Sequence, residues 1–286
     1  MRGIREIRRR IKSVESTKQI TKAMEMVAAA YLRRAQSRVE AARPYSEKLR
    51  QILNSLAGAS DITHPLFEQR EVKNTAILLL TADRGLCGSY NQNVIRAVDI
   101  LLKDHTKDDV ELVIVGKRGR DYYRKRDWKI ADEHIDFAGR LDFERTQKIA
   151  AEVTEMFLSG RVDKVKLVFT RFVSAVTFRV TVADFLPIAK PEVEETAGAT
   201  LDYIYEPDSE SIYEAILPKY IENMVYIAFA ESLASEHGAR MIAMGNATKN
   251  AKEMIDNLTL LRNKVRQASI TNELLDLVGG AEALKG

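Results

Sequence analysis

The feature that most constrains this chain is a helical repeat of apolar residues at its start, running from Ile4 to Leu56. Apolar or small residues recur there at every third or fourth position with no glycine between Gly3 and Gly58. The spacing predicts one helix, in which Pro44 is the single candidate for a bend. About 55 residues would extend roughly 80 Å, at about 1.5 Å per residue. Because a compact domain cannot hold a helix of that length, we expect it to pair with another long element.

A second helical repeat occupies the other end of the chain. It begins at Ser211 and continues through Leu275, with Pro218 near its start and the pair Gly279 and Gly280 as the expected terminator. Each repeat leaves an apolar seam that one helix cannot bury alone. Because a domain must fit between the two helices along the chain, we expect them to form an antiparallel coiled coil.

The middle of the chain follows a different pattern, in which strands alternate with shorter helices. Short apolar runs at 74–81, 110–116 and 164–170 predict buried strands of the parallel type. Helical spacing at 91–103 and 143–158 separates them. This alternation is typical of an open α/β sheet.

Two further segments complete the predicted organisation. Residues 175–182 alternate like an antiparallel strand toward a sheet edge, and residues 187–202 have the composition of a solvated connection. The expected fold class is therefore α/β, with a central open, Rossmann-like domain at 74–206. Coiled-coil helices are expected at 1–58 and 209–286.

Composition excludes several functional classes. Forty-four Lys and Arg against 41 Asp and Glu leave a net charge of +3, which is too balanced for a dedicated nucleic-acid binder. The single cysteine, Cys87, excludes an internal disulfide framework and a multi-thiolate zinc site, and the 4 histidines share no metal-ligand spacing. No run approaches about 18 uninterrupted apolar residues, so we expect no membrane span.

One turn offers a possible site for chemistry. Residues 83–89, DRGLCGS, follow the first predicted strand, where a phosphate could meet a helix N-terminus. The turn lacks both the three-glycine dinucleotide spacing and the Lys-Ser/Thr end of a phosphate loop, so a structural turn is the favoured interpretation. Cys87 fits a small buried side chain better than a thiolate, and Asp83, Asp184 and Glu231 fit solvated or paired carboxylates. We predict no catalytic residue, no cofactor and no metal ligand.

The first predicted helix is locally basic. Eight Arg and Lys side chains in residues 2–22 stand against three Glu side chains in residues 6–25. Three interpretations stay open: a solvated face, complementarity to an acidic partner surface, and nucleic-acid contact, which the lack of interleaved aromatic residues disfavours.

Two segments resemble a known family closely. ITKAMEMVAA at residues 20–29 and VRQASITNELLDLVGG at residues 265–280 are similar to the gamma subunits of rotary F-type ATP synthases of the bacterial type. DRGLCG at 83–88, ESLASEHGAR at 231–240 and YEPD at 205–208 resemble further segments of that family. The likeness extends over essentially the whole chain.

The resemblance implies a central-stalk rotor. Its coiled-coil axle would turn inside a hexamer of alternating alpha and beta subunits, coupling transmembrane proton or other ion flow to ATP synthesis or hydrolysis and regulating both ATPase activity and proton flow. The catalytic sites would belong to the beta subunits, so the chain would be no enzyme and would have no small-molecule substrate. The implied partners are the alpha, beta and epsilon subunits and the membrane c-ring, at the cytoplasmic side of the cell membrane as a peripheral subunit.

The same likeness assigns roles to individual residues. It places Lys22 and Met24 on the axle. Polar contacts with the hexamer are assigned to Arg266, Gln267, Thr271 and Glu273, and the tip in an apolar bearing to Leu274, Leu275 and Val278. The foot near the membrane ring and epsilon is assigned to Tyr205, Glu206 and Asp208.

Two functions of other classes compete with this interpretation. The chain could be a nucleotide-dependent α/β enzyme whose terminal coil serves only for dimerisation, which tight nucleotide binding by the isolated chain would favour. It could also be a coiled-coil scaffold unrelated to bioenergetics, which would fold alone and leave ATPase activity unchanged.

Overall fold

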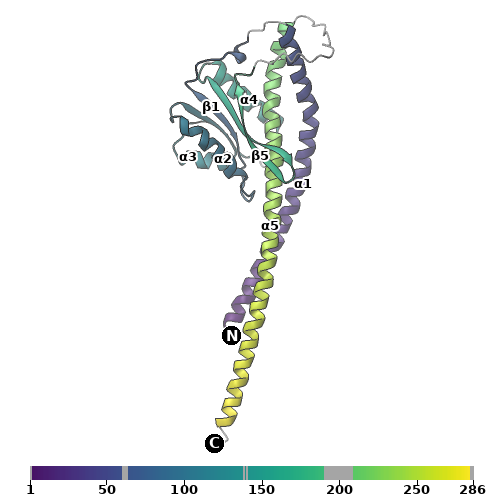
Figure 1. Cartoon of the computed structure of the whole chain (residues 1–286), viewed down its shortest axis with the longest axis vertical. Coiled ribbons are helices and arrows are strands. Elements are labelled where there is room, and N and C mark those ends of the chain that lie inside the picture. Colours follow the sequence, from purple (N-terminus) through teal and green to yellow (C-terminus); the bar gives the residue numbers. More distant parts are fainter. Residues whose placement is uncertain (1, 60–63, 138, 140, 190–208, 284–286) are drawn as a thin grey trace. The chain divides into compact units, whose positions relative to one another are not determined.

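The computed structural model describes residues 2–59, 64–137, 139, 141–189 and 209–283 (Figure 1). The chain divides into two compact units: a terminal unit of residues 1–28 and 240–286, and a central unit of residues 29–239. Two long helices, α1 (Arg2–Ala59) and α5 (Ser209–Ala283), contribute residues to both units. The predicted connection at 187–202 lies mostly outside the described residues.

The two terminal helices confirm the long repeats predicted from the sequence. They have 58 and 75 residues, and they continue through Pro44 and Pro218 respectively. The expectation that Gly279 and Gly280 end the second helix is wrong, because α5 continues to Ala283. Each glycine lowers helix propensity by about 1 kcal/mol, which is too little to end a helix whose neighbours are strong helix formers such as Leu, Glu and Ala.

The central unit contains one five-stranded sheet with the order β3-β2-β1-β4-β5. Strands β1, β2, β3 and β4 run parallel, and β5 is antiparallel to β4 at one edge, as predicted. Strand β3 forms the other edge of the sheet. The sequence did not predict this strand, because three of its five residues are charged or histidine. The strands are β1 (Thr75–Leu80), β2 (Val110–Val115), β3 (Ile130–His134), β4 (Lys164–Ser174) and β5 (Thr177–Leu186).

Helices cover both faces of this sheet (Figure 1). α2 (Tyr90–Leu101) and α3 (Lys117–Arg124) pack on one face, where Ile77, Leu79 and Val98 share a core. α4 (Phe143–Leu158) and the first part of α5 pack on the other. Two 3₁₀ turns, Pro65–Phe67 and Leu102–Asp104, complete the described elements.

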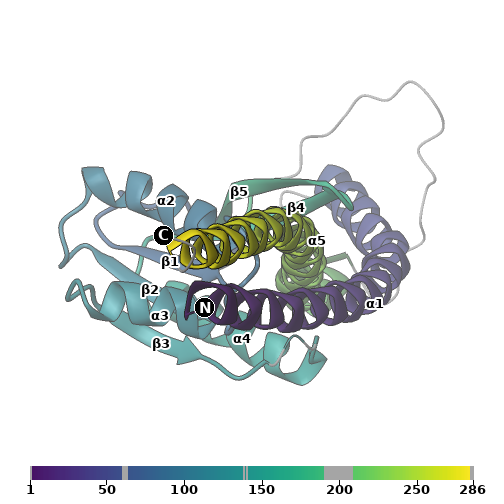
Figure 2. The same cartoon turned by 90° about the horizontal axis from the view of Figure 1, so that it is seen from below.

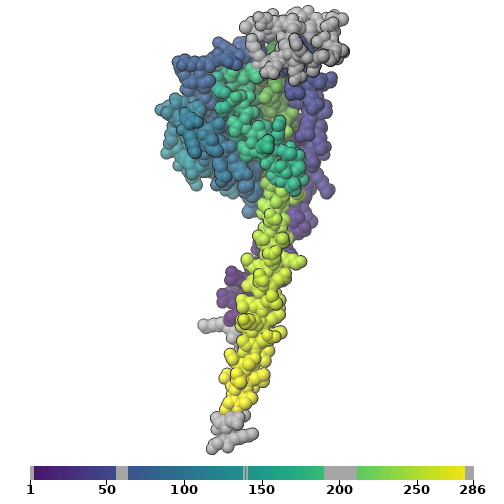
Figure 3. All heavy atoms as spheres, in the orientation of Figure 1, coloured from purple at the N-terminus to yellow at the C-terminus, as the bar shows by residue number. Residues whose placement is uncertain are grey.

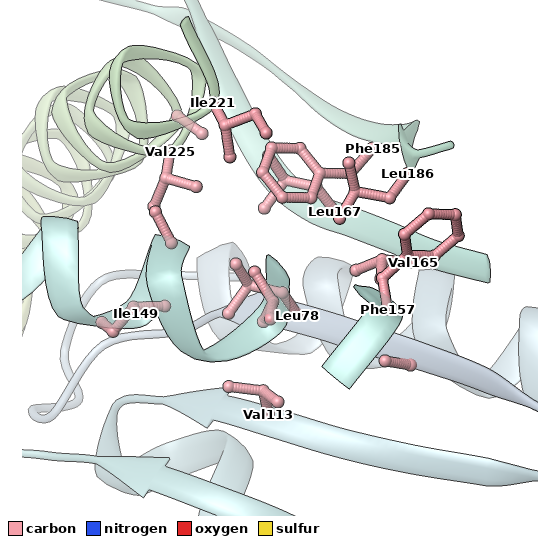
Figure 4. Close-up of a cluster of buried hydrophobic side chains, with 14 of the residues drawn as sticks. Leu78, Val113, Ile149, Phe157, Val165, Leu167, Phe185, Leu186, Ile221 and Val225 are labelled. Carbon is pink, nitrogen blue, oxygen red and sulfur yellow. The ribbon is translucent and has the colours of Figure 1, made fainter. Parts of the chain in front are cut away.

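The larger core lies between the sheet and the helices α4 and α5. Figure 4 shows Leu78 and Leu167 of the sheet facing Ile149 and Phe157 of α4, with Val225 of α5 closing the cluster. These side chains are fully or almost fully buried. Because the side chains of a strand alternate between faces, a continuous apolar run such as TAILLL in β1 supplies both cores at once.

Candidate functional site

The terminal unit is a two-stranded coiled coil. On α1 its buried or half-buried positions follow steps of three and four residues, with Met24 beside them: Ile4, Ile7, Ile11, Val14, Lys18, Thr21, Glu25 and Ala28. The same steps run through α5: Met244, Thr248, Ala251, Ile255, Leu258, Arg262, Val265 and Ser269. A mean spacing of 3.5 residues keeps one seam facing the partner helix and imposes a left-handed supercoil.

Two contacts fix how these seams meet. The Thr248 hydroxyl donates to the Thr21 hydroxyl at 2.9 Å, and Gly245 lies against the Glu25 carboxylate, 3.6 Å from the Cδ to where a Cβ would stand. Moving forward on α1 therefore means moving backward on α5, so the pair is antiparallel, as Figure 2 also shows. Counting outward from Thr21 and Thr248, Ile11 falls opposite Leu258.

Helix α5 continues beyond the start of α1. By the same count Arg2, the first residue of α1, falls near Gln267, and every residue from Ile270 to Gly280 is exposed. Figure 3 shows this C-terminal stretch of α5, in yellow, continuing past the purple residues of α1. Its large apolar side chains are 49–69% exposed: Ile270, Leu274, Leu275, Leu277 and Val278. Contiguous exposed apolar surface of this kind marks an interaction site.

The residues assigned to partner contacts by resemblance fall into three groups. Lys22 is exposed and pairs with Glu25 at 3.2 Å, while Met24 is half-buried beside the seam. Seven lie on the end of α5 and are exposed: Arg266, Gln267, Thr271, Glu273, Leu274, Leu275 and Val278. Tyr205, Glu206 and Asp208 lie outside the described residues. The contacts that these residues make with partners stay a prediction.

The glycine-bearing turn after β1 is held by hydrogen bonds within the chain. The Asp83 carboxylate accepts from the backbone N–H of Lys117 at 3.1 Å and of Asp136 at 3.2 Å. Asn91 accepts from the Ala82 N–H through its side-chain oxygen and donates to the Sγ of Cys87, which is buried. These bonds tie the turn to α2, to the start of α3 and to the loop after β3, so the turn has a structural role.

Polar contacts that the sequence did not indicate hold helix α5 in place on β4. The Ser232 hydroxyl accepts from the Thr170 backbone N–H at 3.1 Å, and the Ser235 hydroxyl donates to the Thr170 carbonyl at 3.2 Å. One turn further, Gly238 lets β5 approach, since a Cβ there would lie 2.7 Å from the Phe178 ring. Directional bonds to both backbone groups of one strand residue fix the position of α5 along the strand.

A buried carboxylate lies next to this contact. Burial raises the pKa of Glu231, while Arg171, Arg43 and the Phe172 N–H oppose that rise. The Arg171 guanidinium is 3.8 Å from the carboxylate and is itself mostly exposed, so it compensates only weakly for the lost hydration. Of the two states that the sequence predicts for Glu231, solvated or paired, the structure shows the paired one, with the side chain buried because α5 packs it against the sheet.

A histidine and two carboxylates converge on the edge of the sheet. His134 of β3 lies 2.8 Å from the Glu152 carboxylate of α4 and 3.7 Å from the Asp132 carboxylate. Burial is the main cause that raises the pKa of Glu152, with the His134 ring opposing it and Asp132 adding to it. One signal for this cluster is present in the sequence, the Asp-x-His spacing at residues 132–134, but only the fold adds Glu152.

No helix in the described part of the chain has the length and apolar character needed to cross a membrane.

The chain is similar to known proteins over its full length. It matches the family described as ATP synthase over residues 3–284. The ATP synthase gamma chain of Heliobacterium modesticaldum is 48% identical, with 99% of this chain and 100% of the relative covered. The gamma chain of Moorella thermoacetica is 47% identical, with both chains covered completely.

Solved structures share the fold. A chain of the Tetrahymena thermophila mitochondrial ATP synthase, in a structure of the central stalk and c-ring, is 26% identical with a TM-score of 0.62, covering 80% of this chain and 99% of that one. A chain of the Euglena gracilis mitochondrial ATP synthase, in a structure of OSCP, F1 and c-ring, is 23% identical with a TM-score of 0.70. That alignment covers 99% of this chain and 94% of the other.

Proposed function

The chain belongs to the ATP synthase gamma-chain family, and from that premise we propose that it is the rotating central shaft of an F-type ATP synthase. The shaft couples transmembrane ion flow to ATP synthesis or hydrolysis and performs no bond chemistry itself. The observation that carries the proposal is the exposed end of α5, where five large apolar side chains extend beyond the coiled-coil seam.

We propose that this end of α5 turns inside a hexamer of alternating alpha and beta subunits. Leu274, Leu275 and Val278 would form the apolar tip in its bearing, and Arg266, Gln267, Thr271 and Glu273 would make the polar contacts around it. Burying one such apolar side chain in a partner is favourable by about 1.5–3 kcal/mol, which supports a partner of the tip over free solvent.

An asymmetric shaft explains how one chain can act on three equivalent neighbours. A two-helix coil that becomes a single helix presents a different surface in each direction. Each orientation therefore favours a different conformation in each surrounding catalytic subunit, since a binding partner shifts the populations of the states it binds differently. Turning the shaft moves each catalytic subunit through these states in order.

The remaining contacts are proposed on the family resemblance. Tyr205, Glu206 and Asp208 belong to the foot, which meets the epsilon subunit and the membrane c-ring, and the assembled chain lies peripherally on the cytoplasmic side of the cell membrane. The division into helices at 1–58 and 209–286 around a domain at 74–206 is the proposed functional organisation.

Reconstitution tests the proposal. Co-expression with the alpha and beta subunits should yield a complex with three copies of each around one copy of this chain. Deletion of residues 271–286 should leave the central unit folded, as judged by the fluorescence of the single tryptophan, Trp128, and should weaken ATP-driven ion pumping in membrane vesicles. Tight nucleotide binding by the isolated chain, with no hexamer recovered, would instead favour an enzyme.

A further inference from the structure

We propose that Asp132, His134 and Glu152 form a binding site for one divalent transition-metal ion, which joins the edge strand β3 to helix α4. The proposal rests on the geometry of the central unit and is independent of the rotor function. It departs from the sequence-based expectation that the chain holds no metal ligand.

The alternation of side chains along β3, together with the position of α4, brings the three side chains together. Asp132 and His134 are two residues apart on β3, so they point to the same face. They are paired in register with Val113 and Val115 of β2, whose side chains belong to the core beneath α4. On that face the side chains of β2 are apolar and those of β3 are polar. Glu152 of α4 lies next to the polar side chains of β3.

The donor atoms of the three side chains lie close enough together to bind one shared ion. The Nε2 atom of His134 lies 2.8 Å from Oε2 of Glu152 and 3.7 Å from Oδ2 of Asp132. One donor atom from each residue lies within 4.8 Å of the others. Donors that bind one ion at about 2.0–2.2 Å are separated by at most roughly 4.4 Å. Small side-chain rotations therefore suffice to place all three on one ion.

The charge of the cluster favours a cation. Glu133, between the two strand ligands, points to the opposite face, where Arg124 holds it at 2.6 Å. Among the described residues no lysine or arginine forms an ion pair with Asp132 or Glu152. With a neutral imidazole the three ligands carry two negative charges, which a divalent ion neutralises.

The ligand types select the class of metal. One imidazole with two carboxylates suits Zn²⁺ and neighbouring first-row ions better than Mg²⁺, which prefers oxygen ligands alone, or soft ions that need thiolates. The ligands are 16–47% exposed, so an ion can enter from solvent and water can fill its remaining positions. The bound ion would tie the unpaired edge of the sheet to α4.

A metal-free arrangement is the competing explanation. In it a protonated His134 bridges the two carboxylates as an ion triple and needs no metal. The two cases differ in their response to Zn²⁺. In a metal site the ion replaces the imidazole proton and stabilises the folded chain by mass action. An ion triple that does not bind Zn²⁺ shows no such stabilisation.

Titration of the full chain with Zn²⁺ separates these cases. We expect one ion per chain by competition with a chromophoric chelator, a raised unfolding midpoint, and visible absorption when Co²⁺ is used in place of Zn²⁺. His134→Ala, Glu152→Gln and Asp132→Asn should each weaken Zn²⁺ binding at least tenfold. The controls are Glu155→Gln, an exposed carboxylate three residues along α4, and His105→Ala, both of which should bind as the unmodified chain does.

Two results would overturn the proposal. One is the absence of stoichiometric Zn²⁺ binding, and the other is equal binding by the cluster variants and the controls. Asp132 is 47% exposed, so Asp132→Asn is expected to fold and keeps the test decisive should His134→Ala unfold. Circular dichroism of each variant verifies folding.

Discussion

Gly116 lies where β2 passes into α3, at a point where other backbone atoms leave no space for a side chain. Its φ is +92°, and a Cβ there would collide with the carbonyl oxygen of Thr81 at the end of the neighbouring strand. The Gly116 N–H also donates to the His134 carbonyl at 2.8 Å, which ties the turn to β3. The positive φ and the closeness of the Thr81 carbonyl therefore both require glycine at this point, while the bond to His134 excludes only proline.

Gly116→Ala should lower the free energy of unfolding by about 3 kcal/mol or more, because a strained φ and a collision with backbone add together. The matched control is Gly160→Ala, at φ +73° with nothing within 4 Å of the added Cβ, which should cost only about 1–2 kcal/mol. Urea unfolding followed by Trp128 fluorescence measures both variants. Equal losses would show that the Thr81 contact relaxes freely.

Glu231 should make the stability of the central unit depend on pH. Because its pKa is raised in the folded state, the protonated form contributes stability below the ordinary carboxyl pKa, and this contribution is lost as pH rises through the folded-state pKa. At neutral pH the buried charge is therefore a cost.

Glu231→Gln should consequently raise the thermal unfolding midpoint at pH 7, with a difference that shrinks toward pH 4. The amide oxygen can still accept from the Phe172 N–H, so the change removes mainly the charge. Differential scanning calorimetry at both pH values provides the measurement. A lower midpoint at pH 7 would mean that attraction to Arg43 and Arg171 outweighs burial.

Two isoleucines on α1 differ in whether they lie in the seam of the terminal helix pair. Ile11 lies in the seam and is 8% exposed, whereas Ile20 lies outside it and is 57% exposed. Their helix propensities are the same, so a difference between their alanine variants reports packing against α5 alone.

Ile11→Ala should destabilise the terminal unit by about 2–4 kcal/mol, and Ile20→Ala should change it by at most about 0.5 kcal/mol. Hydrogen exchange of the amides on either side of Leu258, opposite Ile11, measures the effect as faster exchange in the first variant only. Similar exchange in both variants would contradict the seam.

The elements themselves differed in how well the sequence predicted them. Strand β1 is a continuous apolar run, and β2 and β4 are rich in Val, Leu, Ile and Phe despite single charged residues. Helix α4 shows helical spacing from Phe143 to Leu158, so each of these elements follows from its own residues. β3 could not be recognised, because at a sheet edge its residues Asp132 to His134 pack against polar side chains instead of the core. Its strand conformation comes from pairing with β2.

Substitutions at the exposed end of α5 should separate assembly from folding. Leu275→Ser with Val278→Ser should leave the unfolding midpoint of the chain within about 1 °C, since both side chains are exposed in the free chain. ATP-driven ion pumping in vesicles should fall several-fold, because the partner contacts of the tip are lost.

The control for that experiment is Val173→Ser with Val176→Ser, two equally exposed valines at the β4–β5 turn of the central unit. These changes should leave pumping near its unmodified level. Full pumping by the tip variant together with a loss in the control would place the functional surface on the central unit instead.

The sequence alone determined the two long helices, their antiparallel pairing, the buried strands and, by resemblance, the family. The helices and strands follow from spacing within short stretches, because a spacing of three and four residues fixes which face of a helix is apolar wherever the helix lies. The antiparallel pairing follows from the domain that the chain places between the two helices. Only the tertiary structure decided the bonds from Ser232 and Ser235 to Thr170, the burial of Glu231 and the meeting of Asp132 and His134 with Glu152. Each of these joins residues on elements far apart along the chain, and such contacts depend on strand order and register, which no local pattern encodes.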